Sequence, residues 1–189
     1  DSLGSRGLGD VYKRQYRNEY FKDSKFLLLI GLLMYLIVFS SWIIVSYQLP
    51  VYIIPIAMFS ILLTVLLDTT VSLISSTILI LLVSLLIGND LDFAIIQFFI
   101  SFIAILSVRK LRKRRQIITT MLTLVMCSLF VFFSVMLFKG IDFLDYNYST
   151  VGYLALSSFL CPILAFGLVP LFESFFGITT DLSLIELLD

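Results

Sequence analysis

The sequence contains no histidine, only two cysteines and few charged residues, and each shortage narrows what the protein can be. Without histidine, the chain lacks the commonest general base and the commonest metal ligand. Cys127 and Cys161 both lie inside long apolar runs, so we interpret them as small packing residues, not as a disulfide framework or a metal site. Only 14% of the residues are charged, whereas soluble domains have about 25%. These shortages argue against a soluble enzyme.

Long apolar stretches dominate what is present. Hydrophobic residues make up 60% of the 189 residues, more than one water-soluble core can bury. A membrane-spanning helix needs about 20 apolar residues. Helices also satisfy their own backbone groups in lipid, whereas the strands of a barrel would alternate in polarity. We therefore predict an all-α membrane protein, a bundle of six transmembrane helices with a short cytoplasmic linker helix at its C-terminus. The expected helices cover about 26–46, 51–67, 71–87, 91–108, 117–138 and 151–172.

The charges in the connectors predict how the helices are oriented. Counting spans places nine basic residues on one side of the membrane and one on the other. Because Lys and Arg concentrate in cytoplasmic loops, we expect the side with nine to be cytoplasmic, together with the lead-in 16–25 and both ends of the chain. The nine are Arg17, Lys22, Lys25, Arg109, Lys110, Arg112, Lys113, Arg114 and Arg115, while Lys139 shares its side with Asp90, Asp92, Asp142 and Asp145.

Two polar features have both a structural and a functional interpretation. The basic run at 109–115 resembles a patch for nucleic acid or anionic lipid, but its position between two spans favours a topology signal, and we expect no nucleic-acid partner. Asp68 could relay ions or protons. It precedes Thr69 and Thr70 at a turn, which favours a role in capping the next helix. We find no span that is charged or broken in its middle, as expected in an ion-coupled transporter.

The end of the sixth span predicts a connection to something further along the chain. Pro162 lies in mid-span, where it should kink the helix and provides a candidate hinge. Gly177 suits the end of that helix, and Ser183 with Glu186 has the spacing of a capping box that starts a new one. We therefore divide the chain into a transmembrane domain, 26–176, and a linker, 177–189. The candidate hinge and linker residues are Pro162, Gly177, Thr180, Asp181, Ser183 and Glu186.

The stretch "VPLFESFFGITTDLSLIELLD" resembles the junction after the last membrane helix in the 7TM receptors with an intracellular HD hydrolase domain, in particular the bacterial cyclic-di-AMP phosphodiesterases of the PgpH type. "LPVYIIPIAMFSILLTVLLD" and the basic loop "VRKLRKRR" are similar to further parts of that family. The resemblance covers residues from about 16 to 189. It implies an extracellular domain and one more span upstream, and a cytoplasmic HD domain downstream.

From this resemblance we expect the membrane-anchoring, signal-transmitting module of a cyclic-di-AMP phosphodiesterase in a bacterial cytoplasmic membrane. No catalytic, cofactor-binding or metal-binding residue of the family falls within these positions, so the divalent transition metals belong to the HD domain and this fragment should not be an enzyme. Its expected partners are the lipid bilayer and its own missing extracellular and cytoplasmic domains, and the sequence leaves a homo-oligomer open. The alternative is a multi-pass transporter or a membrane scaffold without catalytic activity.

Residues 1–15 have a separate explanation. The segment "SRGLGDVYKRQ" can be back-translated into DNA that resembles a transposase-based sequencing adaptor. We therefore predict that residues 1–15 are a translated library artefact and exclude them from the fold, as one does a fusion scar. The alternative is a genuine cytoplasmic leader. None of the nine basic residues counted above lies in this segment.

Overall fold

The computed structural model of the chain describes residues 24–109, 115–140 and 148–176. These residues form six α-helices and one 3₁₀ turn, and no strand occurs among them. The prediction of an all-α bundle is thereby confirmed. In chain order the elements are α2 (Ser24–Ser46), the 3₁₀ turn η1 (Val51–Ile53), α3 (Ile56–Leu66), α4 (Thr69–Ile87), α5 (Leu91–Val108), α6 (Arg115–Phe138) and α7 (Tyr148–Phe176).

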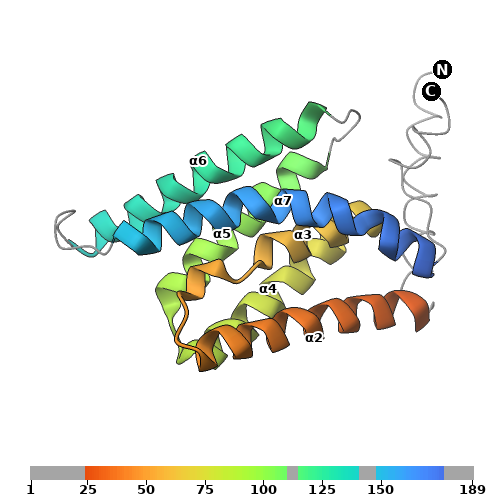
Figure 1. The fold of residues 1–189 in the computed structure, drawn as a ribbon, viewed down its shortest axis with the longest axis horizontal. Coiled ribbons are helices and arrows are strands. Elements are labelled where there is room, and N and C mark those ends of the chain that lie inside the picture. The colour runs from red at the N-terminus through yellow and green to blue at the C-terminus, as the bar shows by residue number, and fades with distance from the viewer. Residues whose placement is uncertain (1–23, 110–114, 141–147, 177–189) are drawn as a thin grey trace, which may run out of the picture.

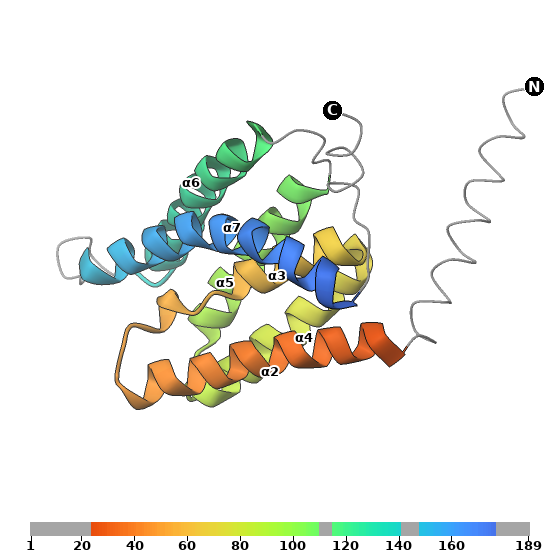
Figure 2. The same ribbon diagram turned by 45° about the vertical axis from the view of Figure 1, so that its right-hand side comes forward.

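The helices pack as a bundle with α3 inside it. Figures 1 and 2 both place α2 at one edge and α6 at the opposite edge, with α3 and α7 between them. Helix α3 contacts α2, α4, α5 and α7, whereas α6 contacts α5 and α7. Five helices, α2 and α4 to α7, are long and apolar enough to cross a membrane, and α3 is a shorter apolar helix.

Both the packed faces and the outer surfaces of these helices are apolar. In α2, Leu29, Leu33 and Ile37 are buried at a spacing of four residues, while Tyr35 and Trp42 are exposed on other faces. Large exposed hydrophobic residues likewise cover α4, α5, α6 and α7. A helix that is apolar on all sides belongs in a large core or in a membrane. The surface therefore suits contact with lipid.

The second span differs from the single helix expected at 51–67. The chain makes the turn η1, then extends through Ile54, and only then begins α3 at Ile56. Ile54 has φ −60° and ψ 122°, because the ring of a following proline, here Pro55, disfavours the helical conformation of the residue before it. The expected helix over 51–67 is thus divided near its start, at Ile54 and Pro55. Helix α3 has 11 residues, or about 16 Å at 1.5 Å per residue.

A cluster of hydroxyl groups joins α3 to α4 inside the bundle. The hydroxyl oxygens of Ser60 and Ser76 lie 2.8 Å apart, and the Ser72 hydroxyl donates to the Ser60 carbonyl oxygen at 2.6 Å. The Thr64 hydroxyl oxygen lies 2.7 Å from the Ser60 carbonyl oxygen and 2.9 Å from the Ser72 hydroxyl oxygen, so both acceptors share its single proton. Polar groups away from water must be paired to be tolerated, so these bonds fix the register of α3 against α4.

The turn between the third and fourth spans follows the prediction. Gly88 has φ 109° and Asn89 has φ 65°, and both N–H groups donate back to the last turn of α4. The Asn89 N–H reaches the Ser84 carbonyl and the Gly88 N–H reaches the Leu85 carbonyl, the bonds of a Schellman motif. Gly88 is needed here because its φ is unfavourable for residues with a side chain.

Candidate functional site

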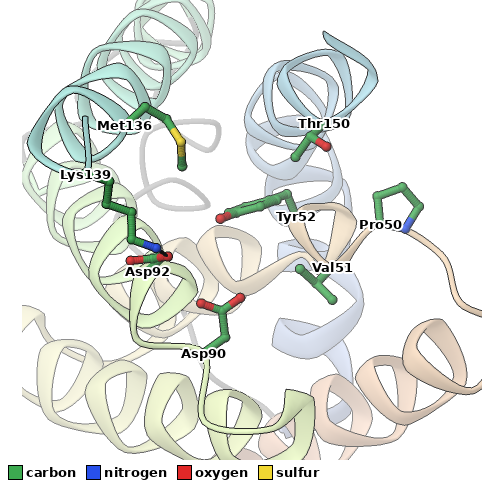
Figure 3. A pocket seen from close by; sticks show the side chains of 8 residues that line it. All are labelled: Pro50, Val51, Tyr52, Asp90, Asp92, Met136, Lys139 and Thr150. Atoms are coloured by element: carbon green, nitrogen blue, oxygen red, sulfur yellow. Dashed lines mark hydrogen bonds and ion pairs between the residues drawn. The ribbon is translucent and has the colours of Figure 1, made fainter. Parts of the chain in front are cut away.

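A cavity of about 340 Å³ lies at the end of the bundle where Lys139 is found. We call it the Lys139 cavity. Its walls come from the segment containing η1, the start of α5, the end of α6 and the start of α7 (Figure 3). Four parts of the chain therefore meet at one place. The residues that line it are Pro50, Val51, Tyr52, Asp90, Asp92, Met136, Lys139 and Thr150.

Three charged side chains line the Lys139 cavity. The Lys139 ammonium forms an ion pair with Asp92, joining the end of α6 to the first turn of α5. The Asp90 carboxylate accepts a hydrogen bond from the Phe93 N–H at 3.1 Å and so caps α5. These three groups sum to one negative charge, since two carboxylates face one ammonium. The Lys139 side chain is 43% exposed and that of Asp92 27%, so the pair remains accessible from outside the protein.

Tyr52 brings a buried aromatic ring to the same cavity. Its ring lies 5.9 Å from that of Phe93 in α5 and 5.8 Å from that of Phe132 in α6, and the contact with Phe132 is edge-on. In Figure 3 the Tyr52 hydroxyl oxygen and the carboxylates of Asp90 and Asp92 all face the cavity. The ring thus joins η1 to α5 and α6, while its hydroxyl group faces the cavity that the charged groups line.

The break in the second span explains how Tyr52 reaches this position. Non-helical backbone is tolerated at membrane depth only where protein buries it or where it lines a water-filled cavity. Both conditions are met here, because Ile54 is fully buried while Pro50 and Val51 line the Lys139 cavity. A continuous helix over 51–67 would carry Tyr52 in a different direction.

We predict that the Lys139–Asp92 pair contributes little to stability. Lys139→Met and Asp92→Asn should each lower the free energy of unfolding by less than about 1 kcal/mol, because exposed ion pairs gain little over solvation of the separate charges. Unfolding of the purified chain by a denaturing detergent measures this. A loss of several kcal/mol in either variant would contradict it and would assign the pair a structural role.

Helix α7 runs from the Lys139 cavity to the other end of the bundle. It spans 29 residues without interruption, with Thr150 near its start and both Pro162 and Pro170 inside it. Proline has no N–H, so the Ser158 carbonyl one turn before Pro162 receives no helical bond from it. Pro162 is buried in the bundle, whereas Pro170 is exposed. The role of Pro162 as a hinge stays a prediction.

The other predicted residues divide between described and undescribed parts of the chain. Arg109 is exposed just after α5, and Arg115 begins α6. Asp68 occupies the N-cap position of α4, but its side chain makes no capping bond, and its backbone carbonyl accepts from the Ser72 N–H at 3.0 Å instead. The remaining predicted residues lie outside the described residues: Lys110, Arg112, Lys113, Arg114, Gly177, Thr180, Asp181, Ser183 and Glu186.

The Lys139 cavity could not be identified from the sequence. The count of spans places Asp90, Asp92 and Lys139 on one side of the membrane, but nothing in the pattern indicates that Asp92 and Lys139 touch. The proline-bounded segment from Pro50 to Pro55 was the signal that could have indicated irregular backbone there. Among the described residues, no three His, Cys, Asp or Glu side chains come close enough to hold a metal ion.

Comparison with known protein families identifies a match that covers most of the chain. A family model described as "7TM receptor with intracellular HD hydrolase" matches residues 7–180, a range that includes every described helix. The range begins inside the segment 1–15. This segment lies outside the described residues, and its interpretation as an artefact stays a prediction. No curated protein and no solved structure matches the chain.

Proposed function

Since the chain belongs to the family of 7TM receptors with an intracellular HD hydrolase domain, we propose that it anchors and regulates a cyclic-di-AMP phosphodiesterase. The family places a membrane module beside a hydrolase, and the bundle described above is that module. The identity of the nucleotide rests on the resemblance of the segment "FGITTDLSLIEL".

One observation supports a regulatory role beyond anchoring. Helix α7 is a single element that begins beside the Lys139 cavity and ends at Phe176, directly before the proposed linker at 177–189. A change at the cavity can therefore move the helix that leads to the hydrolase domain. Coupling of this kind requires one element with two arrangements that both sites influence. The prolines within α7 are where such an element would bend.

The transition metals of an HD domain do not fit the residues present here. The sequence contains no histidine, and the described residues offer no group of three metal-ligating side chains. We assign metal binding and hydrolysis to the HD hydrolase domain that the family description names. Hydrolysis by that domain would use a metal-activated water. The contribution of this chain is to hold the domain at the membrane and to change its position.

Two experiments test the proposed function. The gene read in frame beyond codon 189 should encode an HD motif, and a stop codon there would refute the proposal. In cells, the full-length protein should lower cyclic-di-AMP, and replacing residues 24–176 with an unrelated membrane anchor should remove the regulation of that activity. If the chimera is regulated like the parent, the module only anchors the hydrolase.

We also propose the orientation of the module in a bacterial cytoplasmic membrane, with the Lys139 end outside. Nine basic residues lie on the opposite side by the span count, and such residues concentrate in the cytoplasm. Alkaline phosphatase fused at residue 143 should be active and at residue 112 inactive, with green fluorescent protein showing the reverse. Replacing the six basic residues of 109–115 with glutamine should weaken this bias. Active phosphatase at residue 112 of the unaltered chain would contradict the orientation.

A second candidate is a transporter, which the broken second span favours. Transporters bind substrate at discontinuous helices near the middle of the membrane. The segment of η1 and α3 is discontinuous, but the polar cavity beside it lies at one end of the bundle. Uptake of a labelled solute into vesicles that contain the chain, absent from empty vesicles, would establish this function over the first.

A further inference from the structure

We propose that the Lys139 cavity binds a small zwitterion, a molecule that carries an ammonium group and an anionic group close together. The ammonium group would lie against Asp90 and Asp92, and the anionic group against Lys139 (Figure 3). This inference needs neither the hydrolase domain nor the identity of its nucleotide, so it stands separately from the proposed function.

The charges in the cavity suit a zwitterion better than a single ion. Asp92 and Lys139 already pair with each other, so an ion of one sign that binds one of them would take away the partner of the other. A zwitterion can enter between them and give each a new partner, so no charge is left alone. Asp90 contributes a second carboxylate for the ammonium group, which leaves the empty cavity with one excess negative charge.

The walls and the size of the cavity limit the rest of the ligand. Pro50, Val51 and Met136 provide apolar surface beside the charges, and Tyr52 provides the edge of an aromatic ring. The volume of about 340 Å³ is at the lower end of the range for small-molecule pockets. An amino acid or a molecule of that size fits this combination of a charged end and a short apolar part.

Other ligand classes fit less well. A divalent cation needs several oxygen ligands, but the described residues provide no group of three acidic or other metal-ligating side chains, and Lys139 would repel the ion. A simple anion would meet Lys139 but also two carboxylates. Only a ligand with both charges pairs with all three groups.

Two sources present the same chemistry. A free amino acid carries an ammonium and a carboxylate, and the headgroup of phosphatidylethanolamine carries an ammonium and a phosphate. The cavity is partly open, since the side chains of Lys139 and Asp92 are 43% and 27% exposed, so either source could reach the pair. The lipid in which the protein is studied separates them.

The test is a binding titration of the purified chain in nanodiscs of phosphatidylglycerol. Binding is measured by saturation-transfer NMR. The probes are L-norvaline, n-butylamine and pentanoate, which share an apolar chain and differ in carrying both charges, only the ammonium or only the carboxylate. We expect saturable binding of norvaline with a Kd at least tenfold below that of either relative. Equal binding of the three probes, or no saturable binding of norvaline, would overturn the proposal.

Variants and a second lipid complete the design. Asp92→Asn and Lys139→Met should each weaken norvaline binding at least tenfold, and the matched control Asp68→Asn, at the opposite end of the bundle, should not change it. Either of the first two variants alone decides the point if the other fails to fold. Unchanged binding in a folded variant would refute the site. In phosphatidylethanolamine nanodiscs, a tenfold weaker apparent affinity identifies the lipid headgroup as the ligand, and an unchanged affinity identifies a free solute.

Discussion

Replacing Phe59 with alanine is expected to lower the free energy of unfolding by about 3–5 kcal/mol, the usual cost of removing a buried aromatic ring. Phe59 is fully buried in α3, the helix that contacts α2, α4, α5 and α7. A cavity left there would border several helices at once. The measurement is reversible unfolding of the chain as a denaturing detergent is added to mild micelles.

The matched control for this variant is Phe130→Ala in α6. Phe130 is 74% exposed on a surface that suits lipid, so its loss should change stability by no more than about 0.5 kcal/mol. The two variants delete the same atoms from an apolar helix and differ chiefly in how deeply the ring is buried. Equal losses of stability would mean that α3 does not form the core of the bundle.

The second large effect is expected at Tyr52. Tyr52→Ala should lower the free energy of unfolding by about 3 kcal/mol, because it removes a buried ring together with its contacts to Phe93 and Phe132. Tyr52→Phe keeps the ring and should cost only about 1 kcal/mol, the usual net value of a hydroxyl hydrogen bond. The same unfolding measurement applies.

The difference between the two Tyr52 variants is informative in itself. A large loss for alanine and a small one for phenylalanine would show that packing of η1 against α5 and α6 holds the broken span in place. If phenylalanine were as damaging as alanine, the hydroxyl group would be the dominant contact. If neither variant lost stability, η1 would not be packed as described.

Much of the fold could be predicted from the sequence because the length of an apolar run limits what it can form. Helix α5 coincides with the expected 91–108, and α2 and α4 differ from expectation by two residues at their starts. The broken span could not be predicted in this way, since 51–67 is one uncharged and mostly apolar run. Its break depends on one local effect, the constraint on Ile54 from Pro55, and on burial that only the packed bundle provides.

The candidate site could be predicted only in part, because it depends on how separate helices pack against each other. Charge counting places Asp92 and Lys139 on one side of the membrane, but their contact depends on how α5 packs against α6. Packing of that kind joins residues 47 positions apart, and helical periodicity within a single span carries no information about it. The functions assigned to the basic loop 109–115 and the linker 177–189 stay predictions.

The shortness of α3 has a consequence for how the protein is made. Its 11 residues reach about half of the roughly 30 Å hydrocarbon layer, and Ser60 finds its side-chain partner Ser76 only in α4. During synthesis, α3 leaves the ribosome before α4 does. We therefore infer that α3 and α4 insert as a pair, because α3 alone is too short to cross the hydrocarbon layer and finds its side-chain partner in α4. A nascent chain in which a polar tether long enough to clear the ribosome follows Leu67 should leave α3 accessible to a water-soluble thiol reagent at an introduced cysteine. A chain in which the same tether follows Ile87 should protect it.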